Sequence, residues 1–173
     1  MFRWRPSQRE EPGKGIHTED AYFAISNFST WINNADTKAG FLVAAWTVLV
    51  GALATSGDRI QRALPVAGGR SLAALVFLIL SLSCLSVTAY FLYSALSPRL
   101  PAPGFSRFAF PNVANAKLRD LINADPSRSR EEAWRQARQL AQIALAKFLA
   151  VKRALRFLMS SAVMALVWSF LAK

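Results

Sequence analysis

Cysteine and histidine are almost missing from this chain of 173 residues, which contains one of each, Cys84 and His17. One cysteine cannot form a disulfide within the chain, and one histidine falls short of a metal-ligand set. The glycine-rich phosphate loop and the G-x-S-x-G and H-E-x-x-H motifs are absent as well. We therefore expect no catalytic residues, no metal site and no cofactor, and we do not expect an enzyme.

Charged residues are absent from three stretches of the chain. Residues 39–57 and 71–97 are each long enough for a helix that spans the hydrocarbon core, which takes roughly 20 residues. Residues 157–172 would cover only about 24 Å as a helix, but Arg153 and Arg156 lengthen that span if their charges reach the headgroups. The predicted fold is an all-α membrane protein with three transmembrane helices.

Lysine and arginine are concentrated between the second and the third of these spans. Residues 97–156 contain 12 basic and four acidic residues and so supply +8 of the net charge of +11. Because cytoplasmic flanks are enriched in basic residues, this segment is expected in the cytoplasm. Membrane topology thus accounts for the basic charge, and nucleic acid is not an expected partner.

The predicted organisation alternates across the membrane, with a cytoplasmic N-terminus and a periplasmic C-terminus. Residues 1–17 are expected to be a disordered tail because they are rich in charge and in turn-forming residues. The following segments are a cytoplasmic helix (18–38), transmembrane helix 1 (39–57), a periplasmic hairpin (58–70), transmembrane helix 2 (71–97), a cytoplasmic connector (98–130), a cytoplasmic stalk helix (131–156) and transmembrane helix 3 (157–172).

Apolar residues recur at alternating spacings of three and four along two parts of the chain, which is the pattern of a helix that packs on a partner. Each series crosses a predicted membrane boundary in one register, so the first and last transmembrane helices are expected to extend as cytoplasmic helical stalks. The first series is Ala21, Ile25, Phe28, Ile32, Ala35, Ala39, Leu42, Trp46, Leu49 and Leu53; the second is Trp134, Ala137, Ala141, Ala144, Phe148, Val151, Leu155, Leu158, Ala162 and Ala165.

Hydroxyl side chains give the second span a mildly polar character. Ser81, Ser83, Ser86 and Thr88 either face water or a neighbouring helix, or bond to the preceding turn of their own helix, as serine often does in membranes. Three helices are too few to line a pore. Any activity that perforates the membrane therefore requires a homo-oligomer.

Three features together resemble the Pycsar transmembrane effector family: the N-x-x-D-x-K-A-G segment of residues 33–40, a second span that ends at Pro98, and the stalk sequence of residues 139–148. The resemblance covers about residues 18–171. It implies an antiphage protein of the bacterial inner membrane, with membrane lipids as one partner. A neighbouring cyclase would supply cyclic CMP (cCMP) or cyclic UMP (cUMP), and this signal would make the effector impair membrane integrity and kill the infected cell.

A cyclic-nucleotide-binding β-roll is not recognisable, so the ligand would be held by helices and by the connector. A cyclic phosphate needs a cation, and a pyrimidine needs an aromatic face and amide groups. The candidates are Arg107, Lys117 and Arg119 for the phosphate, Phe108 and Phe110 for stacking on the base, and Asn112 for the edge of the base. In the alternative interpretation, the phenylalanines anchor the connector at the membrane interface and the basic residues face anionic lipid headgroups.

Charged residues at the predicted membrane boundary suggest a gating site, because charges near lipid often mark function. Asn33, Asp36 and Lys38 would engage the basic stalk near Arg153 or Arg156 and hold a closed state that the ligand releases. In the alternative interpretation, Lys38 extends to the headgroups and Asp36 lies in water.

Two other functional classes fit the same sequence. A holin-like toxin would need no ligand and would kill whenever it is expressed. A regulatory or structural membrane subunit would be harmless alone and would bind a partner through its basic stalk.

Overall fold

The computed structural model describes residues 18–63, 68–97, 108, 113–114, 117 and 126–172. These residues form four named helices and no strand: α1 (Thr18–Ala54), α2 (Gly57–Ala63), α3 (Gly69–Leu96) and α6 (Pro126–Leu171). The predicted N-terminal tail and most of the predicted connector lie outside the described residues. The start of α6 at Pro126 suits proline, because the first turn of a helix does not need its missing N–H.

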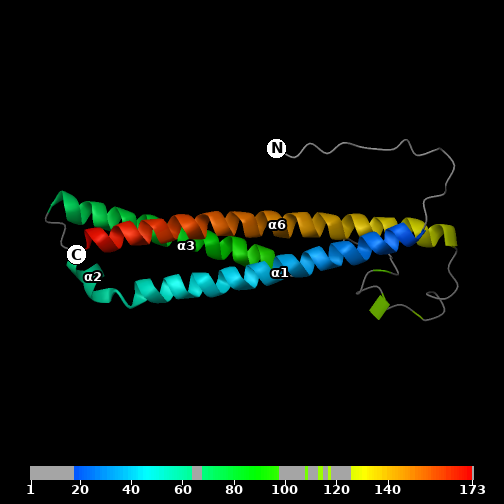
Figure 1. The fold of residues 1–173 in the computed structure, drawn as a ribbon, viewed down its shortest axis with the longest axis horizontal. Coiled ribbons are helices and arrows are strands. Elements are labelled where there is room, and N and C mark those ends of the chain that lie inside the picture. The colour runs from blue at the N-terminus through cyan, green and yellow to red at the C-terminus, as the bar shows by residue number, and fades with distance from the viewer. Residues whose placement is uncertain are drawn as a thin grey trace.

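The three long helices lie side by side and form an elongated bundle (Figure 1). Helices α1 and α6 run in the same direction, and α3 runs antiparallel to both. Helix α6 packs against both α1 and α3, whereas α1 and α3 contact one another much less. Helix α6 is therefore the central element of the bundle, and one side between α1 and α3 stays open.

The predicted all-helical membrane fold is confirmed: among the described residues, three helices are long and apolar enough to cross a membrane. Helix α3 has 28 residues and is about 42 Å long, slightly longer than a hydrocarbon core of about 30 Å. Helices α1 and α6 have 37 and 46 residues and reach about 56 and 69 Å. Their N-terminal parts therefore extend beyond α3 as a two-helix stalk, without a break in either helix (Figure 1).

Alternating spacings of three and four also describe which residues are buried. In α1, all ten positions of the predicted series are buried or half-buried. In α3, the buried residues follow the same spacing: Ala74, Leu78, Ser81, Leu85, Thr88, Leu92 and Ala95. A repeat of 3.5 residues keeps one face of each helix on its neighbours over a long distance, as in a left-handed coiled coil.

The series predicted for α6 agrees with the structure at eight of its ten positions. Five of its members are buried and three are half-buried, but Trp134 and Leu155 are exposed. At the other five positions of the series, the residue just before the predicted one belongs to the packed face. This face is made up of Ala133, Ala137, Leu140, Ala144, Lys147, Val151, Ala154, Leu158, Ser161, Ala165 and Trp168. The prediction placed Trp134 and Leu155 on this face, whereas their smaller neighbours Ala133 and Ala154 occupy it and let the helices approach closely.

A pair of serines joins α3 and α6 in the predicted hydrocarbon zone. Ser81 and Ser161 are fully buried. The Ser81 hydroxyl donates to the Ser161 carbonyl at 3.1 Å, and the Ser161 hydroxyl donates to the Ser81 carbonyl at 3.0 Å. By contrast, Ser83, Ser86 and Thr88 each donate to a carbonyl four residues earlier in α3. Of these four hydroxyls, that of Ser81 connects two helices, and the other three follow the alternative of a bond within their own helix.

At the far end of the bundle, the start of α3 is tied to the end of α6. Arg70 donates from Nε to the carbonyl of Leu171 at 3.1 Å and from Nη2 to the carbonyl of Phe170 at 3.4 Å. The last carbonyls of a helix have no partner within the helix, and a cation there also complements the helix dipole. Arg70 thus satisfies the end of α6 and fixes this end of the bundle.

The serine pair leads to a stability prediction. Replacement of Ser161 by alanine should cost roughly 1 kcal/mol of the free energy of unfolding, because a buried interhelical hydrogen bond is lost. Ser161→Leu should cost more, since a larger side chain overpacks a closed contact, typically by about 1–3 kcal/mol. Thermal unfolding in detergent measures both losses. The control is Ser160→Ala at the exposed neighbouring position, and equal behaviour of S160A and S161A would contradict the prediction.

Candidate gating site at the membrane boundary

The site lies where the three-helix bundle becomes the two-helix stalk. Near the end of α3, Ala95 packs in a cluster with Ala39 of α1 and with Ala150 and Val151 of α6. Small side chains at this position bring the three backbones close together. Beyond this junction, only α1 and α6 continue as described helices.

An ion pair between α1 and α6 follows within one turn of that junction. Lys147 Nζ donates a hydrogen bond to Asp36 Oδ1 at 2.5 Å. The Lys147 side chain is only 8% exposed, whereas that of Asp36 is 38% exposed. Lys147 occupies a position of the packed face of α6, so its charge is surrounded by protein. An ammonium group in such a place is tolerated only when it is paired.

Aromatic contacts join the same two helices at the same level. The rings of Trp31 and Phe148 meet edge to face with centroids 5.7 Å apart. Lys38 Nζ lies 5.4 Å from the centroid of Phe148, within the range of a cation–π interaction. Lys147 and Phe148 are consecutive and point about 100° apart around α6. The ion pair and the aromatic contacts therefore hold α1 from two sides, and we call these five residues the boundary cluster.

The residues predicted to gate are only partly brought together. Asp36 and Lys38 both contact α6, but through Lys147 and Phe148 rather than through Arg153 or Arg156. The guanidinium carbon of Arg153 lies 5.7 Å from the ring centroid of Phe91 in α3 instead.

The remaining two gating candidates are exposed. Arg156 lies on the exposed side of α6, and the side chain of Asn33 is exposed one turn before Asp36. The Asn33 carbonyl accepts a hydrogen bond from the Thr37 hydroxyl at 3.0 Å. The gating role of all of these residues stays a prediction.

Most of the predicted ligand-binding residues lie outside the described part of the chain, namely Arg107, Phe110, Asn112 and Arg119. Phe108 is described, and its ring packs on Tyr22 with centroids 5.6 Å apart. Lys117 is exposed. The structure thus brings one predicted aromatic residue of the connector to the N-terminal end of α1, and the ligand-binding roles stay predictions.

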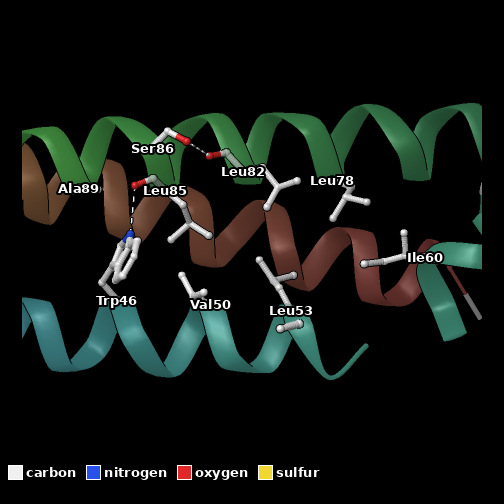
Figure 2. A pocket seen from close by; sticks show the side chains of 10 residues that line it. Trp46, Val50, Leu53, Ile60, Leu78, Leu82, Leu85, Ser86 and Ala89 are labelled. Carbon is white, nitrogen blue, oxygen red and sulfur yellow. Dashed lines mark hydrogen bonds between the residues drawn. The ribbon is translucent and has the colours of Figure 1, made fainter. Parts of the chain in front are cut away.

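A cavity of about 560 Å³ lies on the open side of the bundle, between α1, α2 and α3 (Figure 2). Its walls are formed mainly by aliphatic side chains such as Val50, Leu78 and Leu82. The indole of Trp46 crosses from α1 to α3 and donates to the carbonyl of Leu85 at 3.1 Å (Figure 2). The hydroxyl of Ser86 is bonded to the Leu82 carbonyl. The described lining residues offer no cation to a phosphate, and their aliphatic side chains suit an apolar occupant.

Comparison with known protein families gives a match over most of the chain. The model of the Pycsar effector protein domain matches residues 20–172. The chain belongs to the Pycsar effector family. No curated protein and no solved structure matches the chain. The resemblance noted from the sequence is thus confirmed, and membership supports an antiphage effector role for this chain.

Sequence reasoning missed Lys147 as the partner of Asp36 in this Pycsar effector. The signal was present, because Lys147 lies three residues after Ala144 and four before Val151, in the register of the packed face. A lysine at such a position is readily assigned to solvent. Two observations together identify Lys147 as a packed residue. It has 3–4 spacing from Ala144 and Val151, and the facing helix offers a carboxylate.

The ion pair leads to a second stability prediction. Asp36→Asn should destabilise this Pycsar effector by about 3 kcal/mol, because it leaves the buried ammonium of Lys147 without a counter-charge. A double variant, Asp36→Leu with Lys147→Met, should recover most of that loss, since an apolar pair needs no desolvation of charge. Thermal unfolding in detergent gives both values.

Asp20→Asn, at an exposed position of α1, serves as the control for removing a carboxylate. If D36N loses no more stability than D20N, the ion pair does not hold the stalk helices together.

Proposed function

We propose that this protein is an inner-membrane effector of a bacterial antiphage system. In this proposal, a cyclic pyrimidine nucleotide, cCMP or cUMP, activates it to impair membrane integrity and to cause death of the infected cell. The observation that supports the proposal most directly is the family match over residues 20–172. That match spans all three helices that are long and apolar enough to cross a membrane. Membrane lipids and a cyclic nucleotide from a neighbouring cyclase are its proposed partners.

The proposed orientation places the stalk and the connector in the cytoplasm, where the nucleotide is made. The basic residues of segment 97–156 support this side, because cytoplasmic flanks of membrane proteins are rich in lysine and arginine. The hairpin around α2 and the C-terminus then face the periplasm. In this proposal the chain acts as a ligand-gated membrane protein and not as an enzyme.

The boundary cluster is the proposed gate. Lys147 and Phe148 of α6 hold Asp36 and Lys38 of α1 one turn from the junction with α3. A contact at this level couples the arrangement of the stalk to the start of the spanning helices. Separation of α1 from α6 there would change the packing of both helices in the membrane. A ligand can cause such a change only if it binds the open arrangement more tightly than the closed one.

Membrane damage in this proposal requires assembly of several copies. One protomer has three spanning helices, and its polar groups in the hydrocarbon zone are largely bonded within the bundle, as at Ser81 and Ser161. The open side between α1 and α3 leaves much of both helices without a protein neighbour. A homo-oligomer that forms after activation would cover that side and bring enough helices together to breach the membrane.

The first experiment is a thermal-shift titration of detergent-purified protein with cCMP, cUMP, cyclic AMP and cyclic GMP. We expect a pyrimidine cyclic nucleotide to raise the unfolding temperature selectively, because a ligand that binds only the folded state stabilises it; at 100 times its dissociation constant the gain is about 2.7 kcal/mol. The same nucleotide should release a trapped dye from vesicles that contain the protein.

Dye release without any nucleotide would contradict ligand gating and favour a holin-like toxin. Neither dye release nor a thermal shift, in protein shown to be folded, would favour a regulatory or structural membrane subunit.

Charge reversal at the gate should activate the protein without a signal. Asp36→Lys places a second cation beside Lys147, and like charges at this distance repel. Cells that express D36K without a cyclase should therefore stop growing, while cells that express the unaltered chain or Asp20→Lys should grow normally. Growth curves and membrane-potential dyes measure the effect.

The double variant Asp36→Lys with Lys147→Asp restores opposite charges and should restore growth. If D36K inserts into the membrane at normal levels and stays harmless, the pair is not a gate.

A further inference from the structure

We propose that Lys147 is an anion receptor, which exchanges the carboxylate of Asp36 for a phosphodiester monoanion. The site comprises Asn33, Asp36 and Gly40 on one face of α1 and Lys147 on α6. The cyclic phosphate of cCMP or cUMP has this chemistry, and so does the phosphate of a phospholipid headgroup at the membrane boundary. The nucleotide branch of this inference rests on the proposed function, whereas the lipid branch does not.

The first argument is the unsatisfied capacity of the lysine. An ammonium group has three N–H donors. Among the described residues, Lys147 Nζ has one hydrogen-bond partner, Oδ1 of Asp36. With 8% of its side chain exposed, Lys147 cannot satisfy its other donors with much water. Asp36 is tethered to α1 and reaches the ammonium through one oxygen, whereas a phosphodiester is free to turn two charged oxygens and two ester oxygens toward these donors.

The second argument is charge. A buried ammonium requires an anion at all times, because leaving it unpaired costs several kcal/mol. Asp36 and a phosphodiester each carry one negative charge, so Lys147 remains paired with one anion after the exchange, while the displaced carboxylate of Asp36 stays on the exposed side of α1. Any monoanion that displaces Asp36 thereby breaks the link between α1 and α6 without exposing Lys147 as an unpaired charge. Exchange is thus a direct way for a ligand to open the boundary cluster.

The third argument is access. Asp36 is 38% exposed, so an anion in water reaches the pair from the side of its carboxylate. Asn33 and Gly40 lie three residues before and four after Asp36, and therefore on the same face of α1. A side-chain carbon added at Gly40 would meet no atom within 4 Å. The absence of a side chain at Gly40 leaves space next to the pair, and the exposed amide of Asn33 is placed to bond a ligand there.

This site is distinct from the one predicted in the connector. Phe108 contacts Tyr22, which lies 14 residues before Asp36 on α1 and so about 21 Å away along the helix axis. A single mononucleotide cannot span that distance. Variants at Phe108 and at Lys147 therefore separate the two candidate sites.

The test measures ligand-induced thermal shifts of the full chain in dodecyl maltoside micelles, which contain no phosphate. One arm adds cCMP or cUMP to the micelles; the other arm adds phosphatidylglycerol to the micelles, without nucleotide. Asp36→Asn should bind the anion that stabilises the unaltered chain at least roughly tenfold more tightly, because the carboxylate of Asp36 no longer competes for Lys147. The double variant D36L with K147M, which keeps a neutral packed pair, should lose the response.

Further variants guard against a purely structural effect. Lys147→Arg retains the cation and should retain binding, whereas Gly40→Leu fills the open space and should weaken it. Gly51→Leu is the matched control, since Gly51 also has open space around it but lies far from the pair. Phe108→Ala should leave the response unchanged.

The outcomes separate this inference from the proposed function. If a cyclic nucleotide stabilises the unaltered chain and the D36L/K147M variant equally, the exchange site is wrong and the proposed function stands. If phosphatidylglycerol alone gives a Lys147-dependent shift, the exchange site is right and its anion is a lipid, while nucleotide gating lacks support. If neither probe shifts the unaltered chain, the exchange site is overturned.

Discussion

The structure depends on two polar contacts of the packed face of α6, in which Ser161 and Lys147 are each paired with a residue on a neighbouring helix. Helices in lipid gain little from apolar contacts alone, because lipid chains are equally apolar. Close packing of small residues and a few hydrogen bonds therefore decide which faces meet. Ser161 bonds to Ser81 inside the predicted hydrocarbon zone, and Lys147 bonds to Asp36 at its edge. The first pair fixes α3 on α6, and the second fixes α1 on α6.

The central position of α6 follows from these pairs. Helix α6 carries Lys147 and Ser161, whose buried polar side chains connect it to α1 and α3, so these two helices are held mainly through α6 and little through each other. Between α1 and α3, the indole of Trp46 supplies a single hydrogen bond beside an apolar cavity. The three helices share their apolar core, and α1 and α3 diverge beside the cavity.

Much of the fold was predictable from the sequence, because charge-free runs define spanning helices and a constant 3.5-residue repeat defines which face is packed. All ten positions predicted for α1 are at least half-buried. The prediction was less successful for α6, where Ala133, Lys147 and Ala154 line the packed face and the larger Trp134 and Leu155 do not. A choice based only on the size and polarity of side chains therefore assigned the wrong residues to the packed face at these positions. The pairing of Asp36 with Lys147 depends on the rotation of α1 and α6 relative to each other. The periodicity of either helix alone does not specify this relative rotation.

The two series on α6 share five positions and differ by one residue at the other five, so the faces that they define are centred about 50° apart around the helix axis. Helix α6 thus has two adjacent faces of similar apolar content, and apolar packing alone would leave two rotational settings close in energy. A turn to the second setting would replace Lys147 by Phe148 and Ser161 by Ala162 on the packed face. It would break both interhelical pairs at once, one in each half of a 46-residue helix. Two polar residues therefore select the rotational setting of the whole helix.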